Sequence, residues 1–244
     1  MDQLIKKGIW QLGLGFLDLL APNTCVVCQK PAGWQNAYPL CAECKANLLG
    51  KSYARLSGFS FCKVCGKALI SEQELCLRCR KSIYCFDSIK PLFRYDGEIR
   101  DVILVYKMGS RRSLAAFLAG LVYEEWLRNF DGRPLLPIPP RPKKLKRKGW
   151  DQVEDMSRIL EKKYKVPVLR ILKRFDGTEQ KALGYEARQS NIKGKFYLRS
   201  KMQIPENPVL FDDVFTTGAT LSECARVLKA ASALKVDAIC LAAD

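Results

Sequence analysis

The sequence predicts an α/β protein, a parallel sheet flanked by helices, with a small cysteine-rich module in front of it. Two observations lead to this prediction. Short apolar runs alternate with amphipathic stretches through residues 88–244, the pattern of parallel strands joined by helices. All of the 11 cysteines except Cys224 and Cys240 fall between Cys25 and Cys85, and such clustering marks a separate N-terminal unit.

Composition and charge limit the possible functions. The 244 residues are 48% hydrophobic, enough for a sizeable core in one large domain or two smaller ones. Lysine and arginine number 41 against 25 acidic residues, a formal net charge of +16. This excess favours nucleic acid, phosphorylated metabolites or an anionic membrane face as partners, and a merely basic protein is the alternative. Histidine is absent, so a histidine general base is excluded and any metal site must use cysteine or carboxylate ligands.

The first 22 residues are predicted to form an amphipathic segment. Apolar residues recur near helical spacing through residues 4–20, but the run is short for a bilayer crossing and Asp18 interrupts it. We expect residues 1–22 to include a helix that docks on the rest of the protein. Attachment to a membrane surface and a signal peptide are the alternatives.

Four C-x-x-C pairs dominate the cysteine-rich region. Twelve residues separate the first two pairs and ten separate the last two. Zinc requires four soft ligands in a tetrahedron, which two such pairs supply, so we expect two closed structural zinc sites. Pairing in sequence order is expected, with interleaved pairing as an alternative, and disulfides or an iron–sulfur cluster are competing interpretations. The predicted ligands are Cys25, Cys28, Cys41, Cys44, Cys62, Cys65, Cys76 and Cys79.

The remaining boundaries follow from this assignment. Residues 23–87 are predicted to form a double zinc-ribbon domain and residues 88–244 the α/β domain. Strands are expected where β-branched and apolar residues cluster, and helices where apolar residues recur every three or four positions. The expected strands are 89–95, 135–138, 209–211 and 236–241, and the expected helices are 98–107, 113–129 and 152–164.

The most informative stretch is a strand, two acids, a threonine-rich turn and a helix, over residues 209–231. The N-terminus of such a helix offers free N–H groups and a positive dipole end to a phosphate, and Gly218 lets the backbone approach it. Asp212 and Asp213 can accept hydrogen bonds from vicinal sugar hydroxyls, directly or through Mg²⁺. The alternative is an acidic turn before an ordinary capped helix.

This stretch resembles the phosphoribosyl-pyrophosphate (PRPP) loop of type I phosphoribosyltransferases. The resemblance implies that the long polar loop 175–195 folds over the substrate, so that Lys181 and Arg188 touch the diphosphate and join the two acids as catalytic residues. It also places a basic run beside the pyrophosphate, although such a run can instead grip a nucleic-acid backbone or form a solvated loop. The residues of that run assigned to nucleic acid are Lys143, Lys144, Lys146, Arg147 and Lys148. The implied PRPP-binding residues are Asp212, Asp213, Val214, Phe215, Thr216, Thr217, Gly218, Ala219 and Thr220.

From about Cys25 to the end, the chain resembles the ComF family of competence proteins, which join a zinc ribbon to a phosphoribosyltransferase-like domain. The matching pieces are the four cysteine pairs, the Pro137–Pro140 turn, Gln180, Arg188 with Asn191, Phe196 and the 212–220 loop. Where the family often has Arg-Gly-Phe-Asn-Gln, this chain has Lys-Gly-Trp-Asp-Gln at residues 148–152.

The family resemblance implies a cytoplasmic protein of natural transformation, with the inner face of the membrane as an alternative location. It would bind PRPP and handle incoming single-stranded DNA beside a helicase-like competence partner and a membrane DNA channel. An active phosphoribosyltransferase in nucleotide metabolism and a purely structural zinc adaptor are the alternative functions.

Overall fold

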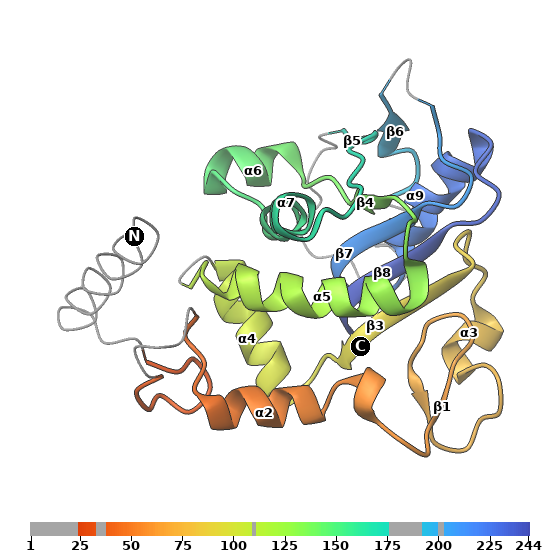
Figure 1. Ribbon diagram of the computed structural model, residues 1–244. Coiled ribbons are helices and arrows are strands. Elements are labelled where there is room, and N and C mark those ends of the chain that lie inside the picture. Colours follow the sequence, from red (N-terminus) through yellow and green to blue (C-terminus); the bar gives the residue numbers. More distant parts are fainter. Residues whose placement is uncertain (1–23, 33–37, 109–110, 176–191, 200–202) are drawn as a thin grey trace.

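In a computed structural model, which describes residues 24–32, 38–108, 111–175, 192–199 and 203–244, helices cover both faces of a central sheet and two small cysteine-rich units border it (Figure 1). The amphipathic segment 1–22, Lys181, Arg188 and most of the loop 175–195 lie outside the described residues. Among the helices of the described part, none is long and apolar enough to cross a membrane.

In the described part of the chain, the sheet is parallel and has four strands in the order β3-β8-β7-β4. The strands are β3 (Ser88–Arg94), β4 (Leu135–Pro137), β7 (Val209–Phe215) and β8 (Asp237–Ala243). Every residue of β8 is buried, as expected for a central strand with helices on both sides. The predicted α/β fold with a parallel sheet is therefore confirmed.

Helices of the two faces pack into separate clusters of buried residues. Helices α4 (Gly97–Met108), α5 (Leu114–Phe130) and α7 (Gln152–Tyr164) pack with Phe211 and other residues on one face. Helix α9 (Ala219–Ala230) packs on the other face, against Leu210 and its neighbours. Adjacent strand residues serve opposite clusters because successive side chains of a strand alternate between faces.

Three smaller elements depart from or extend the expectations from the sequence. The basic run is a short helix, α6 (Pro142–Lys148), with a proline in its first turn and Gly149 at its end in the left-handed conformation, φ 75°. Strands β5 (Leu172–Arg174) and β6 (Phe196–Leu198) pair antiparallel and frame the long polar loop.

The cysteine-rich region consists of two units. The first contains α2 (Ala42–Gly50) and is followed by the 3-10 helix η1 (Tyr53–Arg55). The second contains the short antiparallel pair β1 (Ser60–Phe61) and β2 (Ala68–Leu69), then α3 (Leu77–Lys81).

Each unit joins a different core. Cys25, Cys44 and Leu48 of the first unit pack with α4 and α5. Cys62 and Cys79 of the second pack in the cluster that contains α9. Among the described residues, neither unit has a core independent of the α/β domain, and Figure 1 shows α2 beside α4 and α3 near β3.

Candidate functional site

The eight predicted zinc ligands gather into two clusters of four sulfur atoms. In each cluster all ligand atoms lie within 4.8 Å of one another. The first cluster contains Cys25, Cys28, Cys41 and Cys44, and the second contains Cys62, Cys65, Cys76 and Cys79. The predicted pairing in sequence order is confirmed, and the described cysteines are all free thiols rather than disulfides.

The sulfur spacing fits zinc. A tetrahedron with Zn–S bonds of about 2.3 Å has sulfur atoms about 3.8 Å apart. The Sγ atoms of Cys28 and Cys41 are 3.8 Å apart, and those of Cys65 and Cys76 are 3.6 Å apart. Two closed four-cysteine sites of this kind are structural, since neither leaves a coordination position for a substrate.

Backbone N–H groups support the thiolates. The amide of Cys44 donates to Sγ of Cys41 at 3.4 Å, and that of Cys79 donates to Sγ of Cys76 at 3.5 Å. In both units the accepting cysteine is the N-cap of a helix, so the helix start and the metal site are built from the same residues.

The predicted acid pair lies inside β7, with Asp212 three residues and Asp213 two residues before the strand ends at Phe215. Sequence reasoning ended this strand at Phe211, but pairing of Val214 and Phe215 with β8 extends it through the acids. Strand β4 pairs with β7 only as far as Phe211, so the edge of β7 that β4 covers stops just before Asp212.

The two carboxylates project to opposite faces of the sheet. Asp213 lies on the face of α7 and is 8% exposed, while Asp212 follows Leu210 on the face of α9 and is partly exposed. A ligand that touches both acids must therefore lie across the edge of β7 that becomes open beyond Phe211.

Asp213 is held by two residues that sequence reasoning missed. Its carboxylate accepts a hydrogen bond of 2.7 Å from Nε2 of Gln152 and lies 3.2 Å from Nζ of Lys107. The buried hydroxyl of Tyr106 in turn donates to the carbonyl of Gln152 at 3.0 Å. These partners come from α4 and α7, so no local sequence pattern could have connected them with Asp213.

Asp212 carries an unusual protonation equilibrium. Burial raises the pKa of its carboxyl to about 7, and the neighbouring Asp213 charge acts in the same direction. The hydrogen bond that Asp212 accepts from the amide of Asp213, 2.8 Å long, and the charge of Lys107 oppose that rise. Near neutral pH this site can therefore take up or release a proton when a cation or a hydroxyl group approaches.

The threonine-rich turn leads directly into α9. Gly218 is the N-cap residue of α9 and has φ 78°. Thr217 Oγ1 accepts a 3.3 Å hydrogen bond from the amide of Ala219. A Cβ atom on Gly218 would lie 2.6 Å from the ring of Tyr84, so both backbone conformation and crowding require glycine there. Thr216 is exposed while Thr217 is buried, so the two hydroxyls point into different surroundings.

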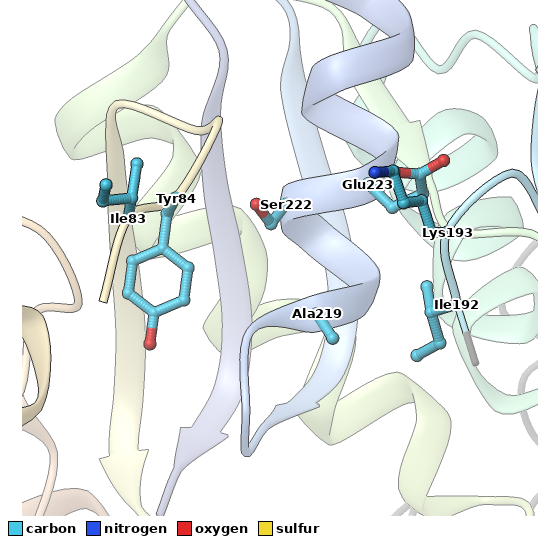
Figure 2. A pocket seen from close by; sticks show the side chains of 7 residues that line it. All are labelled: Ile83, Tyr84, Ile192, Lys193, Ala219, Ser222 and Glu223. Atoms are coloured by element: carbon cyan, nitrogen blue, oxygen red, sulfur yellow. The ribbon is translucent and has the colours of Figure 1, made fainter. Parts of the chain in front are cut away.

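A pocket borders the first turns of α9. Figure 2 shows Ile83 and Tyr84 on one side of the helix, Ile192 and Lys193 on the other, and Ala219 and Ser222 between them. Glu223, which also lines the pocket, accepts a 2.7 Å hydrogen bond from the amide of Gly194 and thereby ties α9 to the end of the long polar loop. The acid pair does not line this pocket.

The basic run divides into two kinds of position. Lys143, Lys146 and Arg147 are exposed on α6, and Lys144 is half-buried. Lys148 instead points inward, where its ammonium donates to the carbonyl of Lys107 and lies 3.6 Å from the centroid of the Trp150 ring. Its burial and the nearby Lys144 charge lower the pKa of Lys148.

Comparison with known proteins agrees with these features. Residues 16–80 match a family described as a double zinc ribbon domain. The chain is 28% identical to Competence protein F of Haemophilus influenzae over 206 residues, 78% of this chain and 90% of the relative. It is 25% identical to Competence protein ComFC of Streptococcus pneumoniae over 201 residues, 81% of this chain and 84% of that protein. Over most of its length the chain is therefore similar to competence proteins of the ComF family.

A further relative, DNA utilization protein YhgH of Escherichia coli, is 24% identical over 233 residues, 91% of this chain and 98% of the relative. In this chain, residues 148–152 lead to the acid pair, because Gln152 at their end donates to Asp213. Asp151 is the N-cap of α7 and accepts from the amides of Val153 and Glu154 at 3.0 and 3.1 Å, a role that asparagine or aspartate can fill.

Proposed function

We propose that this chain binds PRPP, together with Mg²⁺, at the edge of β7 and the turn that follows it. The observation that carries the proposal is the sequence of strand, acid pair, glycine-containing turn and helix N-terminus in one continuous segment, residues 209–220. Such a helix start attracts a phosphate, and the two carboxylates suit a hydrated Mg²⁺ and the sugar hydroxyls.

Each group has a distinct part in this proposal. The N–H groups of Gly218 and Thr220 at the start of α9 would take the 5-phosphate. Asp213, already oriented by Gln152, would accept from the sugar hydroxyls. Asp212 would lose its proton as the cation arrives, because a positive charge lowers the pKa of a neighbouring carboxyl. Loop residues Lys181 and Arg188 remain the predicted diphosphate contacts.

The relatives named for competence and for DNA utilization support a role in DNA uptake, in which the chain handles incoming single-stranded DNA. The exposed cations of α6, Lys143, Lys146 and Arg147, are the surface that we assign to the phosphate backbone. A helicase-like partner and a membrane DNA channel would be its neighbours in that process, which places the protein in the cytoplasm near the membrane.

Titration calorimetry with PRPP and Mg²⁺ tests the ligand. The wild-type chain should bind, and Asp213→Asn should weaken binding by about ten-fold or more, because one charged acceptor is lost. Asp131→Asn, an exposed acid on the turn after α5, is the matched control and should bind as wild type does. No heat with the zinc-loaded wild-type chain would refute PRPP binding.

An active phosphoribosyltransferase in nucleotide metabolism is the second candidate. The presence of both acids and of the threonine-rich turn favours it, since a pure DNA-binding adaptor needs neither. Release of pyrophosphate from PRPP on addition of one nucleobase would support transfer, and binding without release across the common nucleobases would leave PRPP as a ligand only.

A further inference from the structure

The second zinc unit reaches the threonine-rich turn through one arginine. Arg78 lies on α3 between the zinc ligands Cys76 and Cys79. Its Nη1 donates to the carbonyl of Thr216 at 2.6 Å and to the carbonyl of Asp244 at 3.2 Å. The side chain therefore joins a metal site to the turn and to the end of β8.

Two further contacts bind the same regions together. The amide of Cys85, just after the second unit, donates to Oγ of Ser222 on α9 at 3.0 Å. The ring of Tyr84 lies against Gly218 and 6.2 Å, centroid to centroid, from the ring of Phe215. The turn thus lies between the strand that precedes it and the helix that follows it, and it contacts the segment that leaves the second zinc site.

The first zinc unit packs elsewhere. Its Cys25 and Cys44 belong to the buried cluster with α4 and α5, and the ring of Tyr38 lies 5.1 Å from that of Phe117. The second unit shares its cluster with Phe215 and Leu221, which flank the turn. The two metal sites therefore have different neighbours, and only the second has a described contact with the turn.

We propose that the second zinc site positions the phosphate-binding turn, and that Arg78 is the residue through which it acts. This inference rests on the proposed binding of PRPP at that turn. Arg78 is a positioning residue, since it holds backbone of the turn and is not assigned any contact with the ligand.

The peptide plane explains how one hydrogen bond can orient the turn. The carbonyl of Thr216 and the N–H of Thr217 belong to the same planar trans peptide and point in opposite directions. When Arg78 holds the carbonyl, the direction of that N–H is fixed as well. Gly218 comes next and has few conformational limits of its own, so the turn depends on outside contacts for its shape.

Zinc in turn fixes Arg78. Helix α3 has only five residues, far too few to be stable alone. Its N-cap Cys76 and its central Cys79 are both metal ligands, so coordination holds the helix from its start to its middle. With the metal in place, the backbone of Arg78 has a defined position, and only the rotamer of its side chain can vary.

The test uses the full zinc-loaded chain with three variants. Arg78→Ala removes both hydrogen bonds, and Arg78→Lys keeps the charge with a single donor group. Arg80→Ala is the matched control, because Arg80 lies on the same helix and donates to Leu75 instead of the turn. Zinc content and melting temperature are measured for each variant, followed by PRPP affinity with Mg²⁺ and hydrogen exchange of the amides of Thr217 and Ala219 without ligand.

We expect Arg78→Ala to keep two zinc ions, to bind PRPP about ten-fold more weakly and to exchange these two amides faster than wild type. Arg78→Lys should recover part of the affinity, and Arg80→Ala should match wild type. Unchanged affinity and exchange in Arg78→Ala would overturn the inference, as would equal losses in Arg80→Ala. If the wild type does not bind PRPP, the proposed ligand is wrong, and the exchange measurement still decides whether Arg78 orders the turn.

If Arg78→Ala loses zinc, Arg78→Lys decides, because it retains a cation at the same place. The inference would still be supported if Arg78→Lys keeps both zinc ions, exchanges the amides of Thr217 and Ala219 slowly and binds PRPP as wild type does. Loss of zinc in both variants would overturn it, since the arginine would then be needed for the metal site itself.

Discussion

Replacement of Asp212 by asparagine should stabilise the protein at alkaline pH and leave it nearly unchanged at acid pH. The cause is the pKa of the Asp212 carboxyl, which burial and the Asp213 charge raise from its usual 3.8 to about 7. Between these values the unfolded chain is ionised while the folded chain still holds its proton. The free energy of unfolding therefore falls as the pH rises from about 4 to about 7, and the full penalty is present above that range.

The size of this penalty follows from the shift. A difference of about 3 pKa units at 1.36 kcal/mol per unit sets a ceiling of about 4 kcal/mol. Asp212 keeps some contact with solvent, which screens the charge, so we expect about 2 kcal/mol. For a chain of this size that corresponds to a melting temperature roughly 5 °C higher in Asp212→Asn at pH 8.5.

Urea unfolding of the wild type and Asp212→Asn at pH 5 and pH 8.5, both with saturating zinc, measures the effect. Titration of the zinc ligands contributes equally to both proteins and cancels in the difference between them. Asp213→Asn serves as the contrast and should destabilise the chain, because it weakens the contacts from Gln152 and Lys107. An Asp212→Asn variant that is no more stable than wild type at pH 8.5, or equally stabilised at both pH values, would refute this reasoning.

Three further predictions concern the metal, the acid pair and the basic helix. Cys41→Ser should release one of the two zinc ions and unfold the first unit, because three thiolates no longer close a tetrahedral site; elemental analysis showing two zinc ions per chain would contradict this. Gln152→Leu should weaken PRPP binding by about five-fold at unchanged zinc content, measured by calorimetry, because Asp213 loses its orienting donor; wild-type affinity would count against that role. Combined Lys143→Ala and Lys146→Ala should lower the slope of single-stranded DNA affinity against salt by about one to two, measured by fluorescence anisotropy, and an unchanged slope would place the DNA elsewhere.

The parts of the structure with strong local patterns could be predicted from the sequence. Residues 113–129 carry apolar side chains at helical spacing, and α5 occupies Leu114–Phe130. The cysteine pairs also identified both metal clusters and their pairing in sequence order. These features succeed because neighbouring residues determine them: one face of one helix, or the reach of two adjacent turns.

Features that depend on distant contacts could not be predicted. The run 141–148 is missed for a local reason: it has no apolar face, so hydrophobic periodicity does not reveal α6, although Pro142 and Gly149 mark its ends. Strand β7 extends past Phe211 only because β8 lies beside it. Lys107 and Gln152 meet Asp213 through the packing of α4 and α7, and Arg78 meets Thr216 from 138 positions away in the chain.

The second zinc unit also shields a border of the sheet. Strand β3 lies at one end of the described strand order, and on its outer side the amide of Ile89 donates to the carbonyl of Val64 at 2.7 Å. Two residues on, Pro91 has no N–H to offer on that side, and its ring packs against Gly66. A sheet border with unpaired amides is a template for aggregation. Stripping zinc with a chelator would thus do more than loosen a small domain: it would also uncover the outer amide of Ile89 on this border, where Pro91 alone would then limit pairing with another strand.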